Sequence, residues 1–163
     1  MHRLSHIVIK NFRACADVSL PLQGYTPLVG QNNTGSTILQ AIEWVLKPKA
    51  LTTADFSDPK AQIEVDACID GISDEILGRI AVEKHRKAIE PFCREGRLWI
   101  RATSNGTGKN AVKKQVWDVD HCPGDELPEH WRDYPTGLPQ AVSALLPDPL
   151  VVQAMHDLGE DLG

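Results

Sequence analysis

A glycine-rich segment lies between a short apolar run and a helical pattern near the N-terminus of this chain. Leu28 and Val29 precede the segment, and apolar residues at helical spacing follow it from Ile38 to Leu46. A strand, a glycine-rich loop and a helix in this order form a loop whose backbone N–H groups and helix dipole bind phosphate oxygens. The pattern therefore predicts a nucleotide site. Its residues are Gly30, Gln31, Asn32, Asn33, Thr34, Gly35, Ser36 and Thr37.

The same segment lacks the lysine that the pattern G-x-x-x-x-G-K-[ST] places after its second glycine. Ser36 follows Gly35 instead. If Ser36 replaces the lysine, Thr37 takes the position of the magnesium ligand. If the lysine is deleted, Ser36 takes that position in a shorter loop, which the register of residues 38–42 favours. A lysine that is chemically modified, or absent only from the sequence as written, is a third alternative.

Length and composition indicate one globular domain. The chain has 163 residues, of which 42% are hydrophobic and 24% charged, which is enough for a single core. It has no apolar run near the length that spans a membrane, so no membrane partner is expected. The N-terminus leads directly into a strand-like run at residues 7–9 without a signal peptide, which predicts a cytoplasmic location.

The cysteines and histidines do not indicate a disulfide framework or a metal site. Four cysteines are scattered without C-x-x-C spacing, which is typical of reduced structural thiols. Six histidines are also scattered, and His121 beside Cys122 is the nearest approach to a ligand pair. Adjacent residues rarely share one metal ion, so no zinc site is expected.

Charge is unevenly distributed along the chain. The formal net charge of −5 argues against a uniformly basic protein that binds nucleic acid. Basic residues nevertheless form two local groups, which either a solvated face or a contact with the DNA backbone explains. The first group is Lys84, His85, Arg86, Lys87 and Arg94, and the second is Arg97, Arg101, Lys109, Lys113 and Lys114.

The N-terminal third reads as three strands and a helix. Apolar residues predict a strand over 4–10, and the alternation at 18–22 predicts a second strand antiparallel to it. A third strand is expected over 25–29, directly before the glycine-rich segment. The helix that follows is expected to end near Leu46, because Pro48 cannot continue it.

The remainder reads mainly as antiparallel strands. Residues 61–69 alternate cleanly, which predicts a strand with one buried face. Ser73 is expected to cap a short helix, and strands over 98–103 and 111–119 are expected to form a hairpin. The other predicted elements are a surface loop over 122–139, a helix over 140–146 and a strand over 150–154.

The first 46 residues resemble the N-terminus of the RecF/SMC/OLD group of ABC-type ATPases. The opening strand runs into Lys10-Asn11-Phe12-Arg13, which is similar to the I-x-N-F-R/K of that group. The segment Gly30–Gly35 resembles its G-x-N-N-x-G, and the helix at 38–42 matches its continuation. Beyond residue 46 the likeness is confined to the antiparallel strands and to residues 146–158, where His156 stands in place of an arginine.

The resemblance implies an α/β fold, the first lobe of a P-loop NTPase of ABC-ATPase type, with a mixed sheet and an antiparallel β extension. It implies ATP and Mg²⁺ as ligands of the eight residues from Gly30 to Thr37, with Ser36 or Thr37 on the metal. Arg13 would lie near the phosphates, where a guanidinium makes charge-assisted hydrogen bonds.

The resemblance also predicts that residues 1–163 form a single N-terminal lobe of a longer ATPase. The best match to a Walker B strand, residues 63–66, is interrupted by charge, and no Leu-Ser-Gly-Gly-Gln-like signature is present. Members of the group hydrolyse ATP between two protomers, so catalytic residues are not expected in this chain. OLD-type nucleases carry a C-terminal Toprim nuclease domain, which would lie beyond Gly163.

The implied function is that of a nucleotide-binding lobe in an ATP-dependent protein that acts on DNA, most similar to an OLD-family endonuclease in DNA repair or anti-phage defence. Loss of the lysine removes a charge-assisted contact worth about 1.5–3 kcal/mol, so weak ATP binding and no turnover by this chain alone are expected. DNA would be bound through the full-length protein. The alternative is a degenerate, non-enzymatic module for dimerisation or protein interaction. Self-association through the C-terminal end is expected, because a lobe without its other half exposes apolar surface.

Overall fold

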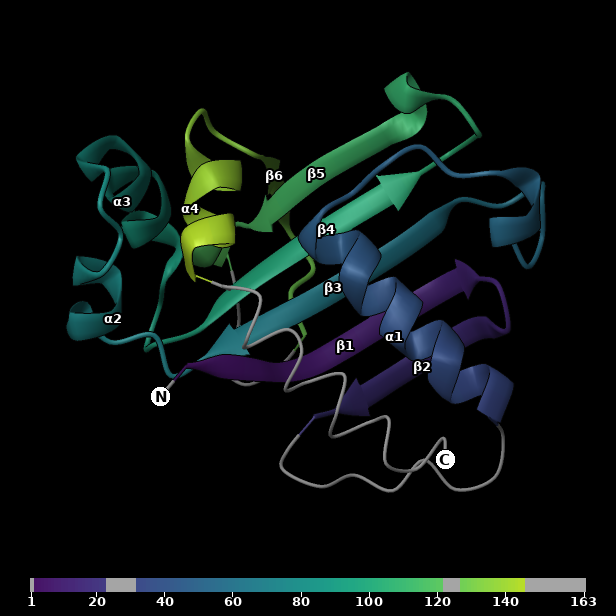
Figure 1. The fold of residues 1–163 in the computed structure, drawn as a ribbon, viewed down its shortest axis with the longest axis horizontal. Coiled ribbons are helices and arrows are strands. Elements are labelled where there is room, and N and C mark those ends of the chain that lie inside the picture. The colour runs from purple at the N-terminus through teal and green to yellow at the C-terminus, as the bar shows by residue number, and fades with distance from the viewer. Residues whose placement is uncertain (1, 23–31, 122–126, 146–163) are drawn as a thin grey trace.

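A computed structural model describes residues 2–22, 32–121 and 127–145. A six-stranded sheet with the order β2-β1-β3-β4-β5-β6 carries the long helix α1 across one face, while α2, α3 and α4 gather at one end (Figure 1). The strands are β1 (Arg3–Phe12), β2 (Cys15–Pro21), β3 (Ile63–Asp70), β4 (Leu98–Ser104), β5 (Val112–Trp117) and β6 (Trp131–Asp133). The helices are α1 (Asn32–Leu46), α2 (Asp74–Gly78), α3 (Glu83–Ile89) and α4 (Leu138–Leu145), with short 3₁₀ helices η1 (Thr53–Asp55), η2 (Glu90–Phe92), η3 (Lys109–Ala111) and η4 (Val119–His121).

The predicted α/β class is confirmed. Six strands are predicted between residues 4 and 119, and β1 to β5 match all of them except the strand over 25–29. Every strand pair among the described residues is antiparallel. The strands predicted over 25–29 and 150–154 lie outside the described residues. The described strands therefore form the antiparallel part of the predicted mixed sheet.

The core lies between α1 and the sheet. Ile38 and Ile42 of α1 are 2% and 0% exposed, and the alternating residues Ile63, Val65 and Ile69 of β3 are all at 0%. Full burial of one such side chain stabilises the fold by roughly 1.5–3 kcal/mol. The predicted packing of this helix on the sheet is confirmed, with Leu39 and Leu46 partly buried at its margins.

The second face of β3 is also buried, contrary to the prediction of a strand with one buried face. Asp66 and Cys68 on this face are 7% and 2% exposed. Trp99 lies opposite Cys68 in the register of β4, and Trp131 of β6 covers the arginine that pairs with Asp66. Large aromatic side chains from β4 and β6 thus exclude water from a face whose own residues are polar.

The segment 122–139, predicted as a surface loop, contains the edge strand β6 and the start of α4. Trp131 is paired with Trp117 across the β5–β6 ladder. The pairing with β5 and the Arg101 guanidinium, 4.1 Å from the centre of the Trp131 ring, outweigh the proline-rich composition from which the loop was predicted. Residues 122–126 lie outside the described residues.

The helix predictions hold where local signals are strong. The Ser73 hydroxyl accepts a hydrogen bond from the backbone N–H of Ile76 at 3.3 Å, which confirms Ser73 as the cap of α2. The helix predicted over 140–146 is α4, and α1 ends at Leu46 as expected. Among the described helices, none is long and apolar enough to cross a membrane.

The described cysteines, Cys15, Cys68 and Cys93, are free thiols. Burial raises the pKa of Cys68 to about 11 and that of Cys93 to about 12, so both stay protonated and unreactive at neutral pH. In a Cys122→Ser background, a thiol reagent such as Ellman's reagent is expected to label these cysteines only after unfolding in guanidinium. Fast labelling of the folded chain would contradict the burial of Cys15 and Cys68 and the raised pKa of the partly exposed Cys93.

Candidate functional site

The predicted phosphate-binding segment leads into the N-terminus of α1. The helix begins at Asn32, inside the glycine-rich segment rather than after it. Asparagine favours helix starts, and the first N–H groups of any helix lack partners within the helix. Thr37, one of the two predicted magnesium ligands, is 5% exposed. Gly30 and Gln31 lie outside the described residues.

Asn11 and Phe12 of the Asn-Phe-Arg motif end β1, and Arg13 begins the tight turn to β2. Asn11 and Arg13 both have positive φ angles, of 63° and 48°, and asparagine tolerates this conformation better than most residues. The Asn11 amide donates to the carbonyls of Asp58 (3.0 Å) and Ala61 (2.9 Å), and its oxygen accepts from the Asp58 N–H. Asn11 therefore clamps the turn to the loop that precedes β3.

Phe12 attaches the same turn to the long helix. Its side chain is 2% exposed and stacks on Trp44 of α1, with ring centroids 6.1 Å apart. The Trp44 indole N–H donates to the carbonyl of Lys49 at 2.9 Å, which holds the segment after α1 against the helix. The turn, the helix and the following loop are thus one packed unit.

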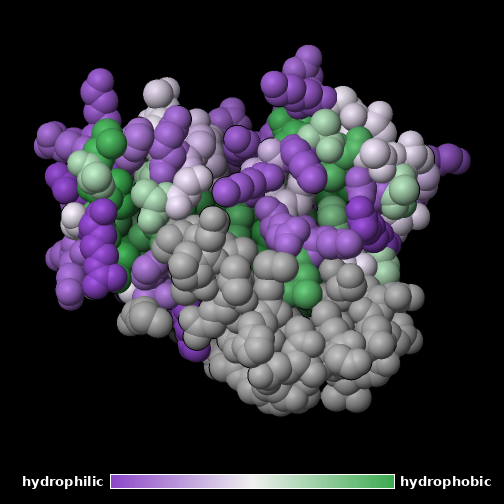
Figure 2. All heavy atoms as spheres, in the orientation of Figure 1, coloured by the Kyte–Doolittle hydropathy of each residue, from purple (hydrophilic) through white to green (hydrophobic). Residues whose placement is uncertain are grey.

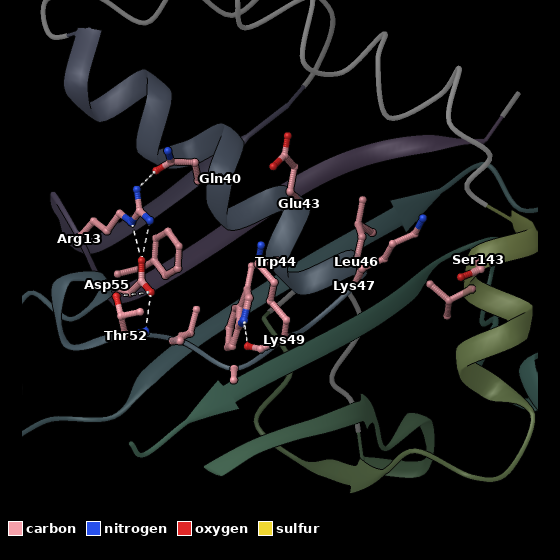
Figure 3. Close-up of a pocket in the computed structure, with 14 residues that line it drawn as sticks. Arg13, Gln40, Glu43, Trp44, Leu46, Lys47, Lys49, Thr52, Asp55 and Ser143 are labelled. Atoms are coloured by element: carbon pink, nitrogen blue, oxygen red, sulfur yellow. Dashed lines mark hydrogen bonds and ion pairs between the residues drawn. The ribbon is translucent and has the colours of Figure 1, made fainter. Parts of the chain in front are cut away.

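Arg13 lies on the flank of α1 and is held by polar contacts (Figure 3). Its Nε donates to Asp55 Oδ1 at 2.8 Å, its Nη2 lies 2.6 Å from the same oxygen, and its Nη1 donates to Gln40 Oε1 at 2.7 Å. Asp55 also accepts from the backbone N–H and hydroxyl of Thr52. Burial raises the pKa of Asp55, but hydrogen bonds from Thr52 and Arg13 outweigh it and leave the pKa below its usual value.

Asp55 and Gln40 were not among the residues singled out from the sequence. A signal for Asp55 was present, because Thr52 and Asp55 have the spacing of a capping box, and the structure forms that box at η1. Gln40 lies eight residues after the start of α1, or about 12 Å along the helix axis. Arg13 is therefore anchored beside the middle of the helix, and its predicted contact with phosphates stays a prediction.

A cavity of about 810 Å³ lies along α1, between the helix, the segment 47–55 and α4 (Figure 3). Its volume is within the range of small-molecule pockets. Its charged lining residues are the Arg13–Asp55 pair, Glu43, Lys47 and Lys49. Phe12 and Trp44 also line it, although both are almost fully buried.

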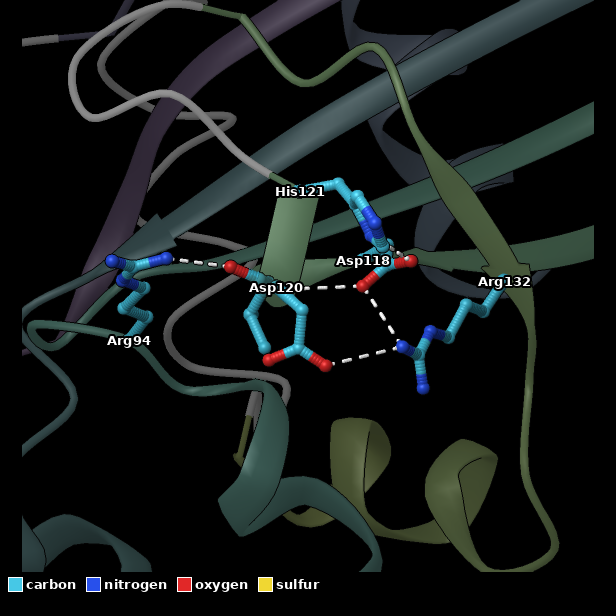
Figure 4. A network of polar contacts seen from close by, with 6 residues as sticks. Arg94, Asp118, Asp120, His121 and Arg132 are labelled. Atoms are coloured by element: carbon cyan, nitrogen blue, oxygen red, sulfur yellow. Dashed lines mark hydrogen bonds and ion pairs between the residues drawn. The ribbon is translucent and has the colours of Figure 1, made fainter.

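A separate polar network occupies the end of β5 and the start of β6 (Figure 4). Asp118 accepts from Arg132 Nη2 at 3.0 Å and contacts His121 Nδ1 at 2.9 Å, and Arg132 also reaches Asp120 at 3.2 Å. The hydrogen bond from Arg132 lowers the pKa of Asp118. A carboxylate held ionised in this way stabilises the strand ends and does not suit a general acid. The described residues contain no cluster of His, Cys, Asp or Glu that could hold a metal ion.

Comparison with known proteins identifies the family to which the chain belongs. Residues 3–121 match the profile of the AAA ATPase domain, and the chain belongs to this family. It is 34% identical over 163 residues to the protein described as Old nuclease of Escherichia phage P2. The match covers 98% of this chain and 26% of that protein, so the chain spans about a quarter of its relative's length. The resemblance to OLD-type ATPases is thereby confirmed.

Proposed function

We propose that the chain is the N-terminal, nucleotide-binding lobe of an ATP-dependent protein that acts on DNA. The observation that carries this proposal is the match to the AAA ATPase domain from β1 to η4, with the glycine-rich segment leading into α1. The relative from phage P2 is described as a nuclease, which supports DNA as the substrate of the full-length protein. A role in DNA repair or anti-phage defence belongs to the same proposal.

In this proposal, ATP phosphates lie at the N-terminus of α1, on the backbone amides of the segment from Gly30 to Thr37. The free N–H groups and the dipole of a helix of 15 residues suit an anion. Ser36 or Thr37 would bind Mg²⁺, which neutralises phosphate charge in phosphoryl transfer. Arg13 would supply a cation from the flank of the helix, although Asp55 already neutralises much of its charge. Binding is therefore weak, and this chain alone does not turn ATP over.

The second candidate function is a degenerate P-loop module that associates with a partner or with itself. Two observations favour it: the absence of the lysine, and the engagement of Arg13 by Asp55 rather than by an open anion site. Such a module would keep the fold of the family without binding nucleotide.

Restoring the lysine separates the two functions. Insertion of lysine between Gly35 and Ser36, or the substitution Ser36→Lys, is expected to raise ATP affinity roughly tenfold or more, since a charge-assisted contact is worth about 1.5–3 kcal/mol. Titration calorimetry with Mg-ATP measures the gain, and insertion of glutamine at the same place is the control. A higher ATP affinity after the insertion supports a deleted lysine, and a higher ATP affinity after Ser36→Lys supports a substituted one.

No gain from either change would favour the degenerate module. The intact mass of the purified wild-type chain then shows whether a modified lysine is present. That mass should equal the mass of the printed sequence if the residue is truly absent.

A further inference from the structure

The structure separates the basic residues of the chain into paired and unpaired groups. Arg101 lies between Asp66 and Glu64, Lys87 lies 3.2 Å from Glu83, and Arg97 lies 4.0 Å from Glu95. Arg94 donates to the carbonyl of Val119 at 2.5 Å. These contacts account for four of the ten residues in the two basic groups noted in the sequence, two in each group.

Three lysines of the β4–β5 hairpin remain without such partners. Lys109 lies in η3, and Lys113 and Lys114 lie in β5. All three are exposed, and within the part of the chain that the structure describes none of them forms an ion pair. The sequence from Gly96 to Trp117 contains no acidic residue, so no carboxylate from the hairpin itself can neutralise them.

The positive charge continues from the hairpin to the end of α1. Lys114 and Lys47 line the same small cavity, of about 180 Å³, together with residues of α4. Lys47 also lines the larger cavity beside Lys49. Hydrophilic side chains project from the molecule at the end where Figure 1 places the hairpin (Figure 2). Lys47, Lys109, Lys113 and Lys114 together are named the hairpin basic surface.

We propose that the hairpin basic surface contacts the phosphate backbone of duplex DNA. This inference rests on the proposed function, because that function supplies DNA as the partner. Lysines on a flexible stem act as point charges, and neutralising phosphates with them releases condensed counterions. Adjacent residues of a strand point to opposite faces, and β6 pairs only with residues 115–117 of β5, so one duplex at this open edge meets Lys113 and Lys114 from the two sides of the strand. The contact positions DNA without reading its sequence.

The salt dependence of DNA binding tests the proposal. A fluorescently labelled duplex is titrated with the chain over a series of KCl concentrations, and the variant Lys109→Ala/Lys113→Ala/Lys114→Ala is compared with the wild type. The slope of log K against log salt is expected to fall by roughly 0.9 for each phosphate that the variant no longer neutralises, or roughly two to three in all. The Lys→Arg triple variant is expected to keep the wild-type slope.

A matched control removes the same charge elsewhere. Arg79, Lys84 and Lys87 lie on or beside α2 and α3, at the other end of the sheet from the hairpin (Figure 1). Their triple alanine variant should keep the wild-type slope. Both alanine variants should unfold thermally like the wild type, because the replaced side chains are on the surface.

Three results would overturn the proposal: an equal decrease of slope in both alanine variants, an unchanged slope in the hairpin variant, or no binding of the duplex by the wild-type chain at any salt concentration. None of these results bears on ATP. The lysine-insertion titration reports on the nucleotide site separately, so a failed DNA surface and a failed nucleotide site are distinguishable.

Discussion

Replacing Arg101 by alanine is expected to lower the free energy of unfolding by roughly 3–5 kcal/mol, because it leaves a buried charge without a partner. The Arg101 side chain is only 18% exposed. It donates to both carboxylate oxygens of Asp66, at 2.7 and 3.0 Å, pairs with Glu64, and lies 4.1 Å from the centre of the Trp131 ring. Urea unfolding measures the loss of stability.

Two comparisons identify the cause of that loss. Arg101→Lys keeps the charge but not the paired donors, so an intermediate loss is expected. Arg132→Ala removes an arginine whose side chain is 50% exposed, and a much smaller loss is expected because exposed ion pairs contribute little. Equal losses at the two sites would contradict the interpretation that burial makes Arg101 important.

The pH dependence of the Arg101→Ala loss follows from Asp66. Burial already raises the pKa of Asp66 above 3.8, in spite of Arg101. A raised pKa in the folded state means that stability is greatest when the group is protonated and decreases as pH rises through the folded pKa. Without Arg101 this pKa rises further, so the loss should be largest at neutral pH and shrink as the pH falls towards 3.8. A loss independent of pH would point to packing alone.

Replacing Asp55 or Arg13 by alanine is expected to destabilise the chain by roughly 2 kcal/mol in each case, since each change removes hydrogen bonds to a charged group. This expected loss of stability is at the lower end of the range because the Arg13 side chain is 42% exposed and solvent screens its charge. The double variant should be little worse than either single one, because both act through the same ion pair. A double-mutant cycle in urea measures this coupling.

Acid unfolding gives an independent check of the same pair. The pKa of Asp55 is lowered from 3.8, so its stabilising contribution is complete above that value and disappears as pH falls through the folded pKa. Asp55→Asn should therefore be less sensitive to acid than the wild type. Asp58→Ala is the matched control, because Asp58 lies in the same loop and its carboxylate accepts from the Lys60 N–H rather than from a cation. Two results would show that Asp55 does not act through Arg13. In one, the stability losses of the two single variants add in the double variant; in the other, Asp55→Asn leaves acid unfolding unchanged.

Elements with a local signal could be predicted from the residues alone. Alternation of apolar residues in β3 and the spacing of Ile38 and Ile42 in α1 are each set by the backbone period of one element. The Ser73 cap and the β4–β5 turn depend on residues within a few positions of each other. The family resemblance in the first 46 residues could also be recognised from the sequence, because its motifs are contiguous.

The pairing of residues far apart along the chain could not be predicted in this way, because it depends on long-range contacts. Arg13 and Asp55 are 42 positions apart, and Asp66 and Arg101 are 35 positions apart. Nothing local distinguishes these charged residues from the exposed lysines of the hairpin, so the sequence grouped Arg101 with Lys113 and Lys114. Burial separated them, because a charge removed from water requires a partner and a charge left in water does not. The same reason explains β6, since Trp131 becomes part of a strand only when β5 and Arg101 are in place to cover it.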